Sequence, residues 1–72
     1  MNKPEVHFES CHESGNIYFV MGLVREALRN AHRITEWNKL RDQILSSGSY
    51  EEALAHIQEH VNLIDDDGRY QL

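Results

Sequence analysis

The chain has 72 residues, which is enough for one domain and too few for two. A formal charge of −5 argues against nonspecific binding to nucleic acid or to an anionic membrane, and no apolar run approaches the roughly 18 residues of a membrane span. Cys11 is the only cysteine, so no internal disulfide can brace the fold, and a lone thiol fits a reducing compartment.

Polar and acidic residues fill positions 1–14, the reverse of the basic, apolar layout of a secretory signal peptide, so we expect a cytoplasmic protein. Within this stretch residues 5–9 alternate between polar and apolar, which would place Val6 and Phe8 on one face of a short strand. Two strands alone are barely stable in water, so any strand here needs helices to pack against.

A long apolar segment follows, and we predict that it forms a helix over residues 16–32. Gly15 breaks the chain before it, and Asn16 is a residue type that caps helices. Residues 17–24 are rich in β-branched and aromatic side chains, but the helical spacing continues for too long to fit an ordinary strand.

The first half of this predicted helix is apolar on nearly every side, whereas a surface helix shows a single apolar stripe. Phe19 and Leu23 point away from the main stripe, so we expect the helix to be covered on more than one side. Gly22 costs about 1 kcal/mol relative to alanine in a helix interior. Close approach of another backbone would explain it, and simple tolerance is the alternative.

Two shorter helices are predicted next. Thr35 can cap the second, and Gly48 would supply the left-handed residue on which helices often end. Ser49 and Glu52 form a capping-box pattern for the third. Its inward residues would be Leu54, Ile57, Val61 and Ile64. The acidic run 65–68 then breaks the chain, and we expect a frayed tail rather than a final strand at 69–72.

These elements predict a mostly α fold, a compact three-helix domain over residues 1–72, with a short N-terminal β-strand left open. The ordered core would cover about residues 15–64, and the short turns favour antiparallel neighbours. The side chains predicted to be buried are Ile17, Val20, Met21, Val24, Leu28, Trp37, Leu40, Ile44, Leu54, Ile57 and Val61.

Three short motifs resemble a group of very small proteins encoded on phages and other mobile elements and in scattered bacterial genomes. The motifs are residues 15–22, the Ser-Gly-x-Tyr stretch at 47–50 and the aliphatic close at Val61. The resemblance covers most of the chain and implies a short strand, a Gly-Asn turn into an apolar helix and a last helix opened by the second motif. The group usually has an acidic residue at the position of Ser49, and both types cap helices. It implies an origin and a fold outline, and no activity or functional residue.

Residues 56–60 read H-x-x-E-H, the inverted zinc-protease motif. On a helix His56 and His60 would share one face and could reach one metal, with Glu59 as the base. A catalytic zinc also needs a third protein ligand and a cleft, and 72 residues leave little scaffold for either. We therefore favour ordinary surface histidines.

His7, Cys11 and His12 form a second cluster of metal-ligating types. A composite zinc site with the C-terminal histidine pair is one alternative, and a Cys11 nucleophile with a histidine base is another. Adjacent side chains on an extended chain rarely face one metal, so unrelated surface residues are preferred. We assign no catalytic, cofactor-binding or metal-binding residue, and we expect no enzyme.

Basic side chains gather in residues 25–41, where five stand against two acidic ones, whereas residues 42–72 carry seven acidic side chains against one basic. The arginines of the basic segment fall at four-residue intervals, so the first two, with His32, could form a ridge that contacts phosphates. The candidate phosphate contacts are Arg25, Arg29, Arg33 and Lys39. Nucleic-acid binding is thus the alternative function, although the acidic remainder of the chain opposes it and a solvated, polarised surface is simpler.

The main functional prediction is a non-enzymatic accessory protein that contacts another protein or its own copy. The first half of the first helix is too apolar for so short a chain to cover easily. The predicted contact residues are Tyr18, Phe19 and Leu23. A monomer that covers all three side chains by itself is the competing possibility.

Overall fold

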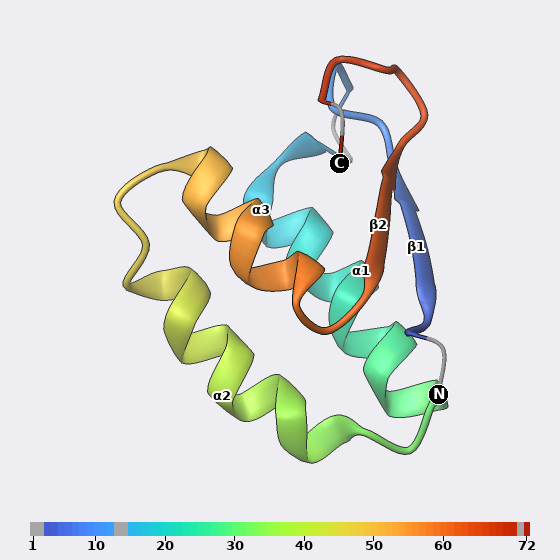
Figure 1. Cartoon of the computed structure of the whole chain (residues 1–72), viewed down its shortest axis with the longest axis vertical. Coiled ribbons are helices and arrows are strands. Elements are labelled where there is room, and N and C mark those ends of the chain that lie inside the picture. Colours follow the sequence, from blue (N-terminus) through green and yellow to red (C-terminus); the bar gives the residue numbers. More distant parts are fainter. Residues whose placement is uncertain (1–2, 13–14, 71) are drawn as a thin grey trace.

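The computed structural model describes residues 3–12, 15–70 and 72. Strand β1 (Glu5–Phe8) comes first and strand β2 (Asn62–Asp65) last in the chain. Between them lie helices α1 (Ile17–Asn30), α2 (Ile34–Leu45) and α3 (Tyr50–Gln58). Figure 1 shows the two strands side by side along one flank of the three helices. The predicted mostly helical fold with three helices and an N-terminal strand is confirmed, and β2 is an addition.

The two strands come from opposite ends of the chain and pair in parallel, with Val6 beside Leu63. Parallel strands need a long crossover, and the three helices supply it. Val6 and Phe8 are buried, and Glu5 and His7, which alternate with them, are exposed, as the alternating pattern predicted. The sheet is thus half-buried, with its inner face on the helices.

The prediction that the third helix continues to Ile64 is wrong. Helix α3 ends at Gln58 and tightens through three-residue bonds from the N–H groups of Glu59 and His60 to the carbonyls of His56 and Ile57, after which the chain extends. Val61 and Leu63 are both buried, which is the period of a strand. This segment forms a strand because it pairs with β1, whose residues lie 57 positions earlier in the chain.

Helix α1 begins where the sequence predicted, because the Asn16 side chain accepts from the N–H of Tyr18 at 2.9 Å. It ends at a turn in which His32 adopts a left-handed conformation, with φ of 59°. The N–H of Arg33 bonds the Leu28 carbonyl and that of His32 bonds the Arg29 carbonyl, which is the Schellman arrangement. The helix therefore stops by backbone geometry rather than at a glycine.

The two glycines around this helix have opposite surroundings. A Cβ on Gly22 would meet no atom outside its own helix, so the suggested close approach of another backbone there is wrong. A Cβ on Gly15 would collide with the backbone carbonyl of Ser10. The Gly15 carbonyl also accepts from the Tyr50 hydroxyl, which ties the start of α1 to α3. Burial and the neighbouring Tyr70 raise the pKa of that hydroxyl.

Of the three caps predicted for the shorter helices, one is confirmed. Thr35 is not the cap of α2, because Arg33 occupies that position and Thr35 lies inside the first turn. Gly48 does not adopt a left-handed conformation either, because Gly68 is the only glycine with a positive φ in the described residues, and α2 ends at Ser46. The Ser49 side chain does cap α3, accepting from the N–H of Glu52, whose carboxylate accepts in turn from the N–H of Gly48.

One core joins the helices to the inner face of the sheet. Every residue predicted to be buried is buried except Ile17, which packs against the core and stays partly exposed, and Ile64, which was predicted as an inward residue of the third helix and is half-buried on β2. The strands and the first turn of α3 add four more buried residues: Val6, Phe8, Ala53 and Leu63. The tail does not pair as a strand at residues 69 and 70, but Tyr70 is held by stacking on Tyr50 at 5.6 Å between ring centroids.

Candidate functional site

The aromatic residues at the start of α1 face solvent. Tyr18 is 71% exposed and Phe19 is 50% exposed, because the stripe that begins with Val20 and Met21 takes the inward side of the helix. Leu23, one turn after Phe19, is half-buried and packs against the core. The expectation that α1 is covered on several sides is therefore met at Leu23 and fails at the two aromatic rings, which the described chain leaves uncovered.

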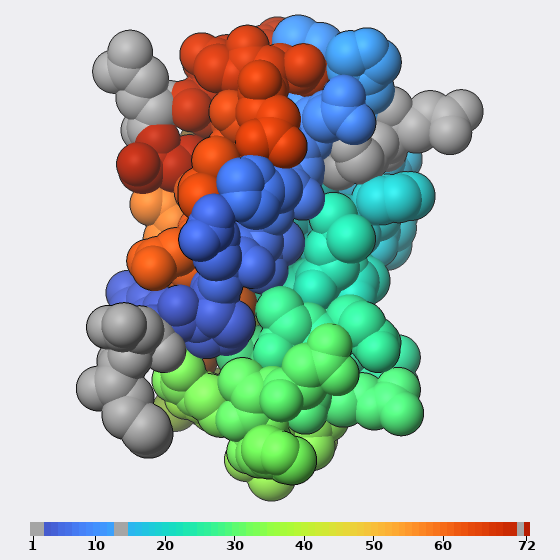
Figure 2. Space-filling view, turned by 90° about the vertical axis from the view of Figure 1, so that its right-hand side faces the viewer, coloured from blue at the N-terminus to red at the C-terminus, as the bar shows by residue number. Residues whose placement is uncertain are grey.

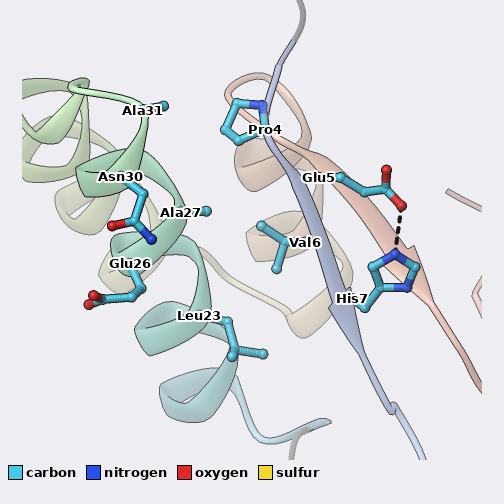
Figure 3. Close-up of a pocket in the computed structure, with 9 residues that line it drawn as sticks. All are labelled: Pro4, Glu5, Val6, His7, Leu23, Glu26, Ala27, Asn30 and Ala31. Atoms are coloured by element: carbon cyan, nitrogen blue, oxygen red, sulfur yellow. Dashed lines mark hydrogen bonds and ion pairs between the residues drawn. The ribbon is translucent and has the colours of Figure 1, made fainter.

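A groove of about 530 Å³ runs between β1 and α1, and Leu23 lies in it. Leu23, Ala27 and Ala31 form the helical wall. Figure 3 shows Val6 pointing from β1 toward this wall, whereas Glu5 and His7 lie on the far side of the strand. In Figure 2 strand β1 crosses the surface with β2 on one side and α1 on the other, so the groove between β1 and α1 is open to solvent.

The backbone of β1 is paired on one edge only. The N–H of Asp66 donates to the Phe8 carbonyl at 2.8 Å, and an equivalent bond from β2 reaches the Pro4 carbonyl. In a parallel ladder the residues that bond a neighbour alternate with residues whose N–H and C=O point the opposite way. The register therefore directs the backbone groups of Glu5 and His7 away from β2. Within residues 3–12, 15–70 and 72 no backbone partner meets these groups.

The predicted ridge of Arg25, Arg29 and His32 does not lie on one helix, because α1 ends at Asn30 and His32 lies in the left-handed turn beyond it. Arg25 and Arg29 are exposed on α1, where Arg29 lies 3.8 Å from Glu26, and Lys39 is exposed on α2. Arg33 lies beyond the end of α1 and is bound to Glu36 through two nitrogens, at 2.5 and 3.0 Å. The Arg33 guanidinium holds the pKa of Glu36 below its usual value. A continuous spacing across residues 25–33 fails because the helix ends at Asn30.

The H-x-x-E-H segment does not present two histidines on one helical face. Helix α3 ends at Gln58, so His56 is in its last turn and His60 lies in the turn beyond. His60 is 3.8 Å from the Glu36 carboxylate. In the described part of the chain the histidine pair belongs to no group of three potential metal ligands. The described residues therefore lack the geometry that the zinc-protease motif needs.

The acidic turn after β2 holds the loop that follows β1. Asp65 accepts from the N–H and the hydroxyl of Ser10, at 3.2 and 2.6 Å, and from the N–H groups of Asp67 and Tyr70. Burial acts to raise the pKa of Asp65, but these hydrogen bonds outweigh it and hold that pKa far below its ordinary value. Asp67 accepts from the N–H of Cys11 at 2.8 Å. The turn is therefore a structural clasp between the two ends of the chain.

The histidines of this region are paired with carboxylates. His7 lies 2.8 Å from Asp66 and 2.6 Å from Glu5, and its hydrogen bonds to Asp66 and then Glu5 raise its pKa. His12 lies 3.1 Å from Asp67, and Glu9 completes a group whose ligand atoms are within 4.8 Å of one another. This group could hold a divalent cation, but it is exposed and such acidic groups are common without one. Cys11 is exposed and free.

Sequence reasoning missed the groove and the clasp because each joins different elements: the groove joins β1 to α1, and the clasp joins the end of β2 to Ser10 and Cys11. The alternation of buried Val61 and Leu63 before the acidic turn was the available signal, and it mirrors Val6 and Phe8. Four residues are too short for that signal to outweigh the helical spacing before them.

The comparisons with known proteins are negative: no protein-family model matches the chain, and neither a curated protein nor a solved structure matches it. The resemblance to small phage and mobile-element proteins stays a prediction. No helix in the described residues has both the length and the apolar character to span a bilayer.

Proposed function

We propose that the chain is a non-enzymatic accessory protein of the cytoplasm that acts by contacting another protein through the surface shared by α1 and β1. The observation that supports this is the position of two predicted contact residues: Phe19 is 50% exposed one helical turn before Leu23, and Leu23 lines the groove. Single exposed apolar residues are ordinary, but here they adjoin a hollow and an unpaired strand edge, which together can bury a partner.

The proposal is tested by placing a photoreactive amino acid at Phe19 and, as a matched control, at Lys39, which is exposed on α2. Irradiation in cells that naturally express the protein should give one discrete cross-linked product from the Phe19 position and none from the control. A product of twice the 8.4 kDa chain mass would identify a second copy as the partner. Equal labelling from both positions, or none, would refute the proposal.

Nucleic-acid binding through Arg25, Arg29 and Lys39 is the weaker candidate. Arg33, the fourth predicted phosphate contact, forms an ion pair with Glu36, and the chain carries a net charge of −5. A titration of a short duplex against salt decides the matter, because phosphate contacts weaken steeply as salt rises. Absence of binding at low salt excludes this mode.

A further inference from the structure

We propose that the groove between β1 and α1 receives an extended peptide of a partner protein, which adds to the sheet as a third strand along the free edge of β1. This rests on the proposed protein-contact function and specifies the partner's chemistry. A sheet edge with unpaired N–H and C=O groups is a template for another extended backbone. The N–H and C=O groups of Glu5 and His7 supply four such bonding positions.

The helical wall matches the repeat of an extended peptide. Leu23, Ala27 and Ala31 follow one another at four-residue spacing, which is about 6 Å along a helix. Alternate side chains of a strand are about 6.6 Å apart and point to the same face. A peptide on β1 would therefore direct every second side chain toward the wall, in step with the hollows that the two alanines leave. These side chains should be apolar.

The charges at the groove specify the other face of the peptide. Glu5 and Asp66 are exposed on the side of β1 that faces away from α1, and His7 lies between them at 2.6 and 2.8 Å, so this side is acidic on balance. Side chains directly opposite each other on neighbouring strands interact, and opposite charges there are favourable. The remaining peptide side chains should therefore be basic. The chemical class is an alternating apolar and basic segment in extended conformation.

A second copy of this chain fits the edge less well than a peptide. Because α1 walls the groove beside β1, a copy docking edge to edge with both helices on the same face of the sheet would have to place its own α1 against this wall. A single extended segment carries no such helix. The hollow on the other side of the sheet, lined by Lys3, Gln58 and Asn62 among others, is mostly polar and offers no comparable apolar wall.

The probe is a capped six-residue peptide of alternating valine and lysine, and its control has the same composition with the valines and lysines in separate blocks. Amide NMR spectra of the isotope-labelled full chain are recorded during titration to about 1 mM peptide, where weak complexes are still visible. We expect saturable shifts at the amides of Glu5 and His7 and along the wall, with at least about tenfold weaker binding of the block peptide.

Two variants test the geometry. His7→Pro removes an outward N–H, together with the side-chain bonds of His7 to Glu5 and Asp66, and leaves the backbone bonds between β1 and β2 intact, a placement that edge strands tolerate. It should weaken binding about tenfold or more. Ala27→Phe fills the groove and should abolish binding, whereas its control, Ala55→Phe on the exposed side of α3, should not change it. Thermal unfolding of each variant verifies that it is folded.

Unchanged binding to folded His7→Pro, equal binding of the two peptides, or no saturable shift would overturn strand addition. A dimer in light scattering that His7→Pro dissociates would also overturn it, because a second copy would then occupy the edge. If a discrete cross-link forms at Phe19 while these peptide results are negative, the protein-contact function stands and only the strand-addition mode fails.

Discussion

The clasp at Asp65 gives the sharpest test of the fold. One carboxylate oxygen accepts from the N–H groups of Ser10 and Asp67, and the other accepts from the Ser10 hydroxyl and the Tyr70 N–H. Asp65→Asn keeps one oxygen and points an amide donor at the Tyr70 N–H. Two charge-assisted bonds are lost or weakened, each contributing about 1–1.5 kcal/mol, so we expect a loss of about 2–3 kcal/mol at pH 7.

The pH dependence of that loss follows from the lowered pKa. A group whose pKa is lower in the folded state stabilises the fold above its unfolded pKa, and this stabilisation is lost as pH falls toward the folded pKa. The ordinary pKa of Asp65 is 3.8 and its folded pKa is far lower. At pH 3 the contribution of the ionised group should therefore have decreased by at most about 1 kcal/mol, since the side chain is only half-buried.

The assay is urea unfolding of the wild type and Asp65→Asn at pH 7 and pH 3. A 72-residue domain has a total stability of about 4–11 kcal/mol, so a difference of 2–3 kcal/mol shifts the midpoint clearly. The difference between the two proteins should shrink at pH 3. A variant within about 0.5 kcal/mol of the wild type at pH 7, or a difference that grows at pH 3, would refute the role assigned to this carboxylate.

Three further outcomes are expected. His32→Gly relieves the left-handed strain at φ 59° and should stabilise the chain by about 0.5–1 kcal/mol in urea unfolding; a loss of stability would contradict the helix-end geometry. Gly15→Ala forces a Cβ into the Ser10 carbonyl and should lower the free energy of unfolding by about 1–3 kcal/mol. Gly22→Ala places its methyl in open space within a helix and should raise the free energy of unfolding by about 0.5–1 kcal/mol. Similar effects at the two glycines would argue against the packing described. The pKa of His7 is raised, so its protonated form stabilises the fold below the ordinary pKa of 6.5, and this contribution is lost as pH rises through the folded pKa. NMR titration should show that the pKa of His7 falls in Asp66→Asn. An unchanged pKa would exclude the pairing of His7 with Asp66.

The contact residues of the candidate site could be named from the sequence, but their surroundings could not. Periodicity placed Phe19 and Leu23 off the main stripe of α1, and the structure leaves the first half-exposed and sets the second in the groove. The groove itself is made by Val6 facing Ala27, which lie on two different elements, β1 and α1. Helical spacing within one segment carries no information about such a partner.

Local chemistry alone determined the helices. The cap at Asn16, the cap at Ser49 and the inward stripes are set by residues within a few positions of one another, and both caps and all of the stripe residues except Ile17 and Ile64 were predicted correctly. Such interactions act before any long-range contact forms, which is why they can be recognised in the sequence.

Tertiary structure decided what happens at the two ends of the chain. Asn62–Asp65 becomes a strand because β1 is there to pair with it, and Gly15 is needed because Ser10 approaches it. The open edge of β1 exists for the same reason, since the side of Glu5 and His7 that faces away from β2 is defined only once β2 has taken the other side. A four-residue strand has too few local contacts to form by itself, so its existence, its direction and its free edge depend on a partner more than fifty residues away.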